Sequence, residues 1–267
     1  NMPDVILVEH DWAARWYDDL PAGVPTVLAL ENLSWQYYER RGKRLEARRF
    51  KRFDDTHLPR YDVLLTMSDD DKAHVAGRTE TIPNGVDTTA LKATPLPTEP
   101  TALFTGTFDY PPNAEALDWL IKDIWPRIRA ELPEARLFVV GRGAQVDGPG
   151  IEVAGWVPEM QPWFDRARAV LVPIRSGAGT RLKVLDGLAS GRGLVSTTMG
   201  AEGIRVVPEQ HALLADTADA FAAAAVRVLA QASVAERLGA EGRRLAEETY
   251  DWRVIGARLE AVLKDLS

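Results

Sequence analysis

The sequence predicts an α/β protein with two Rossmann-like, doubly wound parallel sheets, the first of them incomplete. Throughout the 267 residues, short apolar runs alternate with stretches of helical periodicity, as in chains built from βαβ units. The alternation is interrupted once, by TIPNGVDTTALKATPLPTEPT, whose prolines and Asn-Gly turn mark a linker between about 84 and 100. We therefore expect a first domain over 1–95, a second over 96–250 and a closing helix over 251–267.

The first domain opens almost at once with the apolar run PDVILVEH. Runs of this kind form parallel strands that are covered on both faces. A central strand normally has neighbours made earlier in the chain, so this opening leads us to expect that upstream residues are missing. The expected strands lie near 5–9, 26–30, 62–66 and 79–82, and the expected helices near 12–19, 35–54 and 69–76.

The second domain shows a more complete set of elements. The stretch 114–131 has one apolar face at helical spacing, and Pro126 inside it should kink the helix or reset its start. Alanine-rich and apolar stretches later in the chain predict further helices. The expected strands lie near 101–105, 136–140, 151–154, 169–173, 193–197 and 212–214, and the later helices near 217–231, 233–248 and 252–265.

Composition narrows the class of function. The net charge of −7 argues against nucleic-acid binding, because phosphate backbones need clustered positive charge. No window approaches the roughly 18 consecutive apolar residues that span a bilayer. The chain contains no cysteine, which removes disulfides and thiolate metal sites and fits a cytoplasmic location.

One segment departs from the acidic average. RRGKRLEARRFKR, at 40–52, carries eight Lys or Arg residues against one Glu. A surface helix of this composition suits contact with anionic lipid or with a charged substrate, and contact with lipid would make the protein membrane-peripheral. The alternative interpretation is a solvated basic helix face.

The stretch SGAGTRLKVLDGLASG has the composition of a helix start that binds an anion. Unpaired N–H groups and the positive end of the peptide dipole gather there. Gly177 and Gly179 allow close backbone approach, and Arg181 can add bidentate contacts to phosphate. Lys183 and Asp186 can share one helix face. The alternative is an ordinary helix start with a surface ion pair.

Other site motifs are incomplete. GRGAQVDG has Val146 where a dinucleotide fingerprint needs its third glycine, and neither GxxxxGK[ST] nor GxSxG occurs. In SDDDK, Ser68 followed by Asp71 is better explained as a capping box than as a metal site. No metal spacing relates the four histidines, which are His10, His57, His74 and His211.

Parallel sheets bind ligands at the carboxyl ends of their strands. The loops that follow strands of the second domain should therefore converge, and a phosphorylated, nucleotide-bearing ligand is expected there. These loops are 106–113, 141–144, 155–160 and 174–181.

Several motifs, in order from about residue 3 to 255, together resemble family 4 glycosyltransferases of the GT-B fold. They are IPNGVD, FTGTFDYPPNAEAL, VVGRG, AGWVPEM and GAGTRLKVLDGLASGRGLVSTTMGAEGI. The resemblance implies a retaining, metal-independent transferase without a cofactor. Such an enzyme moves a sugar, for example a hexose, from a nucleotide-diphosphate donor to an acceptor hydroxyl. The acceptor would be a sugar, a lipid-linked molecule or a small molecule.

The resemblance also implies roles for particular residues. Arg142 and Val157 would lie at the donor base, Asp186 at the ribose, and His10 and Asn32 on the acceptor side, with Glu31 replacing the usual histidine. The residues implied at the donor phosphates are Gly106, Thr107, Gly177, Gly179, Thr180, Arg181, Leu182 and Lys183.

The sequence departs from the family pattern at three points. Ala178 stands at the first carboxylate of the Glu-x7-Glu motif, the basic pair after the first donor-domain strand is missing, and the family comparison leads us to expect that the front of the acceptor domain is missing. Arg181 and Lys183 are hypothesised to substitute as positive groups. Two alternatives stay open: a non-catalytic or truncated homologue that binds nucleotide sugar, and a sugar-nucleotide epimerase, for which no acid–base pair is evident.

Overall fold

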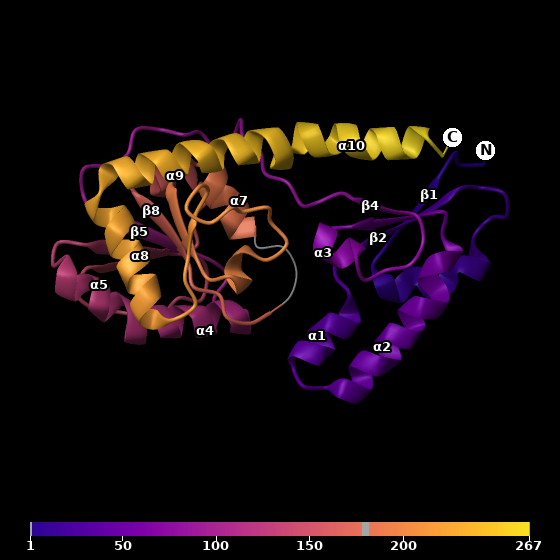
Figure 1. The fold of residues 1–267 in the computed structure, drawn as a ribbon, viewed down its shortest axis with the longest axis horizontal. Coiled ribbons are helices and arrows are strands. Elements are labelled where there is room, and N and C mark those ends of the chain that lie inside the picture. Colours follow the sequence, from indigo (N-terminus) through magenta and orange to yellow (C-terminus); the bar gives the residue numbers. More distant parts are fainter. Residues whose placement is uncertain (1, 178–181, 267) are drawn as a thin grey trace. The chain divides into compact units, whose positions relative to one another are not determined.

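The computed structural model of the protein describes residues 2–177 and 182–266, which form two compact units (Figure 1). The first unit consists mainly of the residues up to Asn84 together with those from Arg253 onward, and the second of the intervening chain up to Trp252. The division after Asn84 falls at the N-terminal end of the expected linker, whereas the expected boundary was at 95/96. The final helix, expected as a separate element, is grouped mainly with the first unit.

The first unit contains a parallel sheet in which each strand lies beside the next one along the chain, in the order β1-β2-β3-β4. All four strands fall within the ranges expected from the sequence. They are β1 (Ile6–Glu9), β2 (Thr26–Leu30), β3 (Val63–Thr66) and β4 (Thr79–Thr81). The helical segments are η1 (Asp11–Asp19), α1 (Ser34–Arg40), α2 (Arg44–His57), η2 (Leu58–Arg60) and α3 (Asp69–Lys72).

Both faces of this sheet are covered, because successive side chains of a strand point to opposite sides. Leu28 and Leu64 belong to one apolar cluster with Ala14 of η1. Val27 and Val63 belong to the other cluster, which is completed by the C-terminal helix α10 (Trp252–Lys264). The chain therefore returns at its C-terminal end to complete the core of the first unit.

The single helix expected over 35–54 is wrong: α1 and α2 are separate helices. Gly42 adopts φ 70°, and its N–H donates to Glu39 O at 2.9 Å while Lys43 N–H donates to Tyr38 O at 2.9 Å. These two bonds form a Schellman motif, which closes a helix on a glycine in the left-handed region. Gly42 could have indicated the end of a helix, but the basic residues on both sides of it were interpreted as one continuous helix.

The second unit contains a parallel sheet in the order β10-β9-β8-β5-β6-β7. In chain order this is 3-2-1-4-5-6, the doubly wound Rossmann arrangement, whose ligand crevice lies where the order reverses. Here the reversal falls between β5 and β8. The strands are β5 (Thr101–Thr105), β6 (Arg136–Val140), β7 (Ile151–Gly155), β8 (Ala169–Val172), β9 (Gly193–Ser196) and β10 (Leu213–Leu214).

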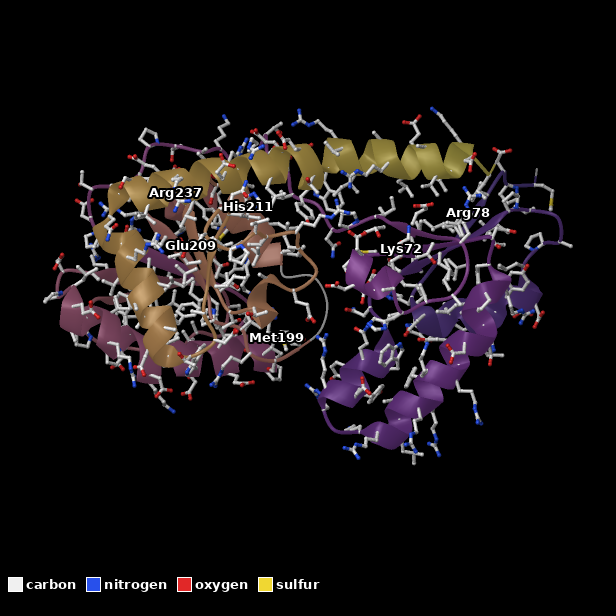
Figure 2. The ribbon with its side chains drawn as sticks, in the orientation of Figure 1. Lys72, Arg78, Met199, Glu209, His211 and Arg237 are labelled. Carbon is white, nitrogen blue, oxygen red and sulfur yellow. The ribbon has the colours of Figure 1, made fainter. Side chains whose placement is uncertain are left out.

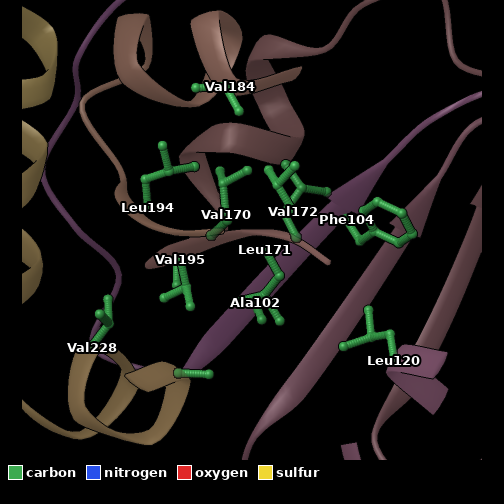
Figure 3. Close-up of a cluster of buried hydrophobic side chains, with 14 of the residues drawn as sticks. Ala102, Phe104, Leu120, Val170, Leu171, Val172, Val184, Leu194, Val195 and Val228 are labelled. Carbon is green, nitrogen blue, oxygen red and sulfur yellow. The ribbon is translucent and has the colours of Figure 1, made fainter. Parts of the chain in front are cut away.

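Helices cover both faces of this sheet, and buried aliphatic side chains such as Val170, Leu171 and Val195 fill the space between (Figure 3). The predicted break at Pro126 is confirmed: a π-helical turn, η3 (Leu120–Ile124), separates α4 (Pro111–Trp119) from α5 (Trp125–Glu131). The short α6 and the turn η4 were not anticipated. The remaining segments are α6 (Gln161–Asp165), α7 (Leu182–Ala189), η4 (Met199–Ala201), α8 (Ala218–Ala230), α9 (Ala232–Leu245) and η5 (Ala246–Tyr250).

Local chemistry explains the start of α3. Ser68 Oγ accepts a hydrogen bond from Asp71 N at 3.0 Å and donates one to Asp71 Oδ2 at 2.7 Å. The N-cap role of Ser68 predicted from SDDDK is therefore confirmed, with Asp71 bonded to the Ser68 hydroxyl, although α3 ends at Lys72, earlier than the expected 76. Within the described ranges, no single helix is long and apolar enough to cross a membrane, while one sharply bent pair, α8 with the segment Ala232–Tyr250, passes on length and composition alone.

Candidate functional site: a cavity at the strand ends of the second unit

Two glycines bring the loops after β5 and β6 into contact. Gly141 has φ 137°, and a β-carbon built there would lie 1.7 Å from the carbonyl oxygen of Gly106. Gly106 N donates to Val140 O at 3.0 Å and Gly141 N donates to Gly155 O at 2.7 Å, so both loops continue the hydrogen bonding of the sheet. No side chain fits at position 141 without moving backbone.

These loops form the floor of a cavity of about 420 Å³, a size typical of small-molecule sites. It brings together four residues that the family resemblance placed at the donor: Gly106, Thr107, Arg142 and Val157. Three of the four loops that were expected to converge, 106–113, 141–144 and 155–160, therefore contribute to it. The additional lining residues are Thr105, Val140, Gly141, Trp156 and Met160.

Arg142 is held at the rim of this cavity. Its Nε donates to Asp109 Oδ2 at 2.9 Å, while 71% of its side chain stays exposed. The Arg142 carbonyl accepts from Phe108 N at 2.8 Å, and Gly143 leaves room for the Asp109 carboxylate, which would lie 2.5 Å from a β-carbon at that position. The guanidinium is thus positioned beside the cavity but remains accessible to a ligand.

A buried amide connects the cavity to the start of α7. Asn113, only 7% exposed, donates from Nδ2 to Thr107 O at 2.9 Å and accepts at Oδ1 from Lys183 Nζ at 3.0 Å. One side chain therefore fixes the loop after β5 and the ammonium of the predicted phosphate-binding segment. Both contacts lie within the second unit.

A carboxylate on α4 fixes the loop before that segment. Glu115 accepts a hydrogen bond from Ser176 Oγ at 2.7 Å, and its carboxylate lies 3.6 Å from the guanidinium of Arg175. Gly177 follows with φ 104°, a conformation that favours glycine. The predicted phosphate residues Gly179, Thr180 and Arg181, together with Ala178, lie outside the described residues.

Helix α7 carries the two remaining donor-site predictions. Leu182 begins the helix and is 53% exposed. Burial raises the pKa of Asp186 to about 6, and the positive charge of Lys183 lowers it in part. A carboxyl group whose pKa is raised toward neutral pH by burial is a common feature of binding sites.

The two acceptor-side predictions lie in the first unit, after β1 and β2. His10 has φ 73° and ψ 140°, a strained combination for a residue with a side chain. Its Nδ1 lies 3.5 Å from Glu31 Oε2, its N–H donates to Ala29 O at 2.9 Å, and its ring stacks on Trp12 at 5.7 Å. Asn32 is exposed next to Glu31.

The two Rossmann-like units define the GT-B fold, and solved structures share it. Sucrose-phosphate synthase from Thermosynechococcus elongatus is 20% identical with a TM-score of 0.75, covering 98% of this chain and 73% of that one. HepE from Anabaena, solved in complex with UDP and glucose, is 13% identical with a TM-score of 0.72, covering 98% and 77%. A UDP-forming trehalose-phosphate synthase from Burkholderia xenovorans is 15% identical with a TM-score of 0.72, covering 98% and 74%.

Sequence comparison defines the second unit further. Residues 99–231 match the model of the family described as "Glycosyl transferases group 1", so this segment is similar to the group 1 glycosyltransferases. A curated relative, an uncharacterized 44.6 kDa protein of the cps region of Klebsiella pneumoniae, is 24% identical over 163 residues. The matched segment covers 56% of this chain and 42% of that relative.

The structure also reveals site residues to which sequence reasoning gave no role. Asn113 and Glu115 lie in the stretch FTGTFDYPPNAEAL and Trp156 in AGWVPEM, but only the folded chain shows that Asn113 joins two loops and that Trp156 lines the cavity. Trp156 is 73% exposed, and this is unusual for so large an apolar side chain beside a cavity. Its place in the loop 155–160, directly before Val157, was the available signal.

Proposed function

We propose that the protein is a retaining glycosyltransferase that moves a sugar, for example a hexose, from a nucleotide-diphosphate donor to an acceptor hydroxyl. The observation that carries the proposal is the glycine-floored cavity of the second unit, which is linked through Asn113 to Lys183. The donor base would lie between Arg142 and the Val157 backbone, and the ribose would meet Asp186. A cytoplasmic location is part of the proposal and agrees with a chain that lacks cysteine.

The chemistry would rest on the departing diphosphate. The bond from the anomeric carbon to the diphosphate oxygen breaks, and a bond from that carbon to the acceptor oxygen forms on the same face of the sugar. The acceptor hydroxyl loses its proton to the departing diphosphate oxygen. Lys183, with Arg181 and the backbone N–H groups at the start of α7, would stabilise the negative charge that develops on the diphosphate. This arrangement requires neither a protein nucleophile nor a metal ion.

The acceptor would bind to the first unit, near His10 and Asn32. Strained backbone is retained where the surrounding structure over-determines it, often at functional sites. The strained His10, held by its hydrogen bond to Ala29 O, is the observation in favour. A sugar, a lipid-linked acceptor or a small molecule is compatible with this placement.

The test is calorimetric titration of UDP, GDP, dTDP and ADP into the protein and into Lys183→Ala. We expect one nucleotide to bind, and Lys183→Ala to weaken it by roughly tenfold or more, because a charge-assisted hydrogen bond contributes about 1.5–3 kcal/mol. Lys122→Ala is the matched control, since Lys122 is 70% exposed and pairs with Asp118. Absence of binding to all four nucleotides would refute the donor site.

A second assay separates transfer from binding alone. The nucleotide that binds is supplied as its sugar conjugate, and release of free nucleoside diphosphate is followed with and without sugar and lipid-linked acceptors. Acceptor-dependent release supports the transferase. Binding without release or transfer would instead indicate the non-catalytic homologue, and a change of sugar configuration without loss of the nucleotide would indicate an epimerase.

A further inference from the structure

Helix α2 presents a row of arginines on one exposed face. Arg44, Arg48 and Arg52 follow one another at four-residue spacing and are exposed, so they lie on the same side of the helix. Leu45, 60% exposed, lies on this side as well. Ala47 and Asp54 are the residues of this helix that are buried in the unit.

These arginines lack the partners that other surface arginines have. Within the described part of the chain, the guanidinium groups of Arg44, Arg48 and Arg52 form no ion pair with a carboxylate. In the second unit, by contrast, Arg227 pairs with Glu209 at 2.8 Å, and Arg237 donates to the Glu209 carbonyl beside it (Figure 2). The charge of the α2 row is therefore available to an external anion.

Exposed aromatic rings continue this surface from η1. Trp12 is 48% and Trp16 43% exposed, and their rings meet edge to face at 5.4 Å. Arg15 lies 4.8 Å from the Trp16 ring centroid. Tryptophan beside arginine is the combination found at membrane–water interfaces, where the ring enters the headgroup layer and the cation meets phosphate.

A cavity of about 320 Å³ joins η1 to α2. Its walls combine three aromatic rings with two guanidinium groups, which suits a ligand with an apolar part and an anionic part. The lining residues are Trp12, Arg15, Arg49, Phe50 and Phe53. None of the row arginines lines the cavity, but Arg49 lies four positions after Leu45 and three before Arg52, so it is their neighbour on the helix surface. The row on α2 therefore borders, through Arg49, the cavity that Trp12 and Arg15 line.

We propose that this cationic–aromatic surface, formed by Trp12, Trp16, Arg44, Leu45, Arg48 and Arg52, binds the surface of an anionic phospholipid bilayer. The arginines contact headgroup phosphates, while the two tryptophans and Leu45 enter the interfacial layer. Charge complementarity favours this partner, because the segment 40–52 is strongly basic in a chain of net charge −7. The exposed apolar side chains favour lipid over a soluble polyanion, which would offer them nothing to enter.

The test is cosedimentation of the intact protein with vesicles of phosphatidylglycerol mixed with phosphatidylcholine, and with vesicles of phosphatidylcholine alone. We expect binding to the anionic vesicles only. Arg44→Glu with Arg48→Glu should lower the partition coefficient by about 20-fold or more, since each basic residue near an anionic surface contributes roughly fivefold. Trp12→Ser with Trp16→Ser should also lower it without changing the net charge.

The matched control carries the same charge change elsewhere. Arg127→Glu with Arg227→Glu removes two exposed arginines of the second unit, each of which takes part in a surface ion pair that contributes little to stability. The control should keep most of the binding, and thermal unfolding confirms that each variant is folded. Equal loss in both charge variants, or equal binding to both kinds of vesicle, would overturn the proposal. So would a tryptophan-independent binding to dextran sulfate of similar strength, which indicates a soluble polyanion. None of these outcomes depends on donor binding.

Discussion

Replacing Asp186 by asparagine should stabilise the protein at neutral pH while weakening nucleotide binding at the proposed donor site. Burial raises the pKa of Asp186 from 3.8 to about 6, so folding favours the protonated acid. A difference of this size corresponds to an ionisation penalty of about 3 kcal/mol, at roughly 1.4 kcal/mol per pH unit. The asparagine side chain would resemble the neutral acid in shape and would not incur the penalty.

The sign determines the pH window. Because the folded pKa is raised, the wild-type protein is at no disadvantage below about pH 4, loses stability relative to the variant as pH rises toward 6, and loses no more above that. Urea unfolding of both proteins at pH 4 and pH 7.5 measures this difference. We expect similar midpoints at pH 4 and a variant more stable by about 1–3 kcal/mol at pH 7.5.

Asp147→Asn, at an exposed position, is the control and should leave the midpoint unchanged at both pH values. Nucleotide titration completes the assay, because a carboxylate accepts ribose hydroxyls better than an amide does. An Asp186→Asn variant that is less stable than the wild type at pH 7.5, or one whose stability difference does not vary with pH, would refute the reasoning from burial.

Three further substitutions test the geometry. Gly141→Ala would place a β-carbon 1.7 Å from Gly106 O, so we expect a loss of more than about 2 kcal/mol and loss of nucleotide binding in calorimetry; Gly256→Ala, with nothing within 4 Å of its added methyl, should be neutral or stabilising in the same unfolding assay. Asn113→Ala should cost roughly 2–4 kcal/mol by urea unfolding, because it removes one neutral and one charge-assisted hydrogen bond, and an unchanged midpoint would show that the two loops are held without it. Burial and the neighbouring Asp11 raise the pKa of Asp54 to about 7, so Asp54→Asn should gain stability over wild type as pH rises from 4 to 8, and the opposite trend in the unfolding midpoint would contradict this.

The spacing of apolar residues, together with prolines and capping residues, predicted most of the fold. The strands of both sheets, the break before Pro126 and the cap at Ser68 follow from local patterns of apolar spacing and hydrogen-bonding side chains. The break at Gly42 was missed because the helical pattern resumes directly beyond it, and the left-handed glycine needs only two hydrogen bonds to end α1. Strand order could not be read locally, since it depends on pairings between distant segments.

For the candidate site as well, the sequence could place some residues and not others. Gly106 and Arg142 were placed by motif, and the structure brings them to one cavity. The role of Asn113 was not accessible, because an asparagine near a helix start is ordinary in sequence and gains its meaning from Lys183, seventy positions away. Residues that are far apart in the sequence and meet only in the folded chain produce no periodic pattern in the sequence.

Burial of charge has different meanings at two places in the second unit. Arg192 is fully buried, yet its guanidinium donates to the carbonyls of Thr94, Pro95 and Ala167. These hydrogen bonds offset most of the free-energy cost of removing its charge from water. They also hold the chain before β5 in place. Asp186 has only a partial offset from Lys183, and that lysine also bonds to Asn113. A ligand whose hydroxyl groups donate hydrogen bonds to the Asp186 carboxylate would offset the rest of the free-energy cost of burying that charge. The ionised carboxylate thus lowers the stability of the free protein beside the predicted phosphate-binding segment, and this is a physical reason to propose that the donor binds there.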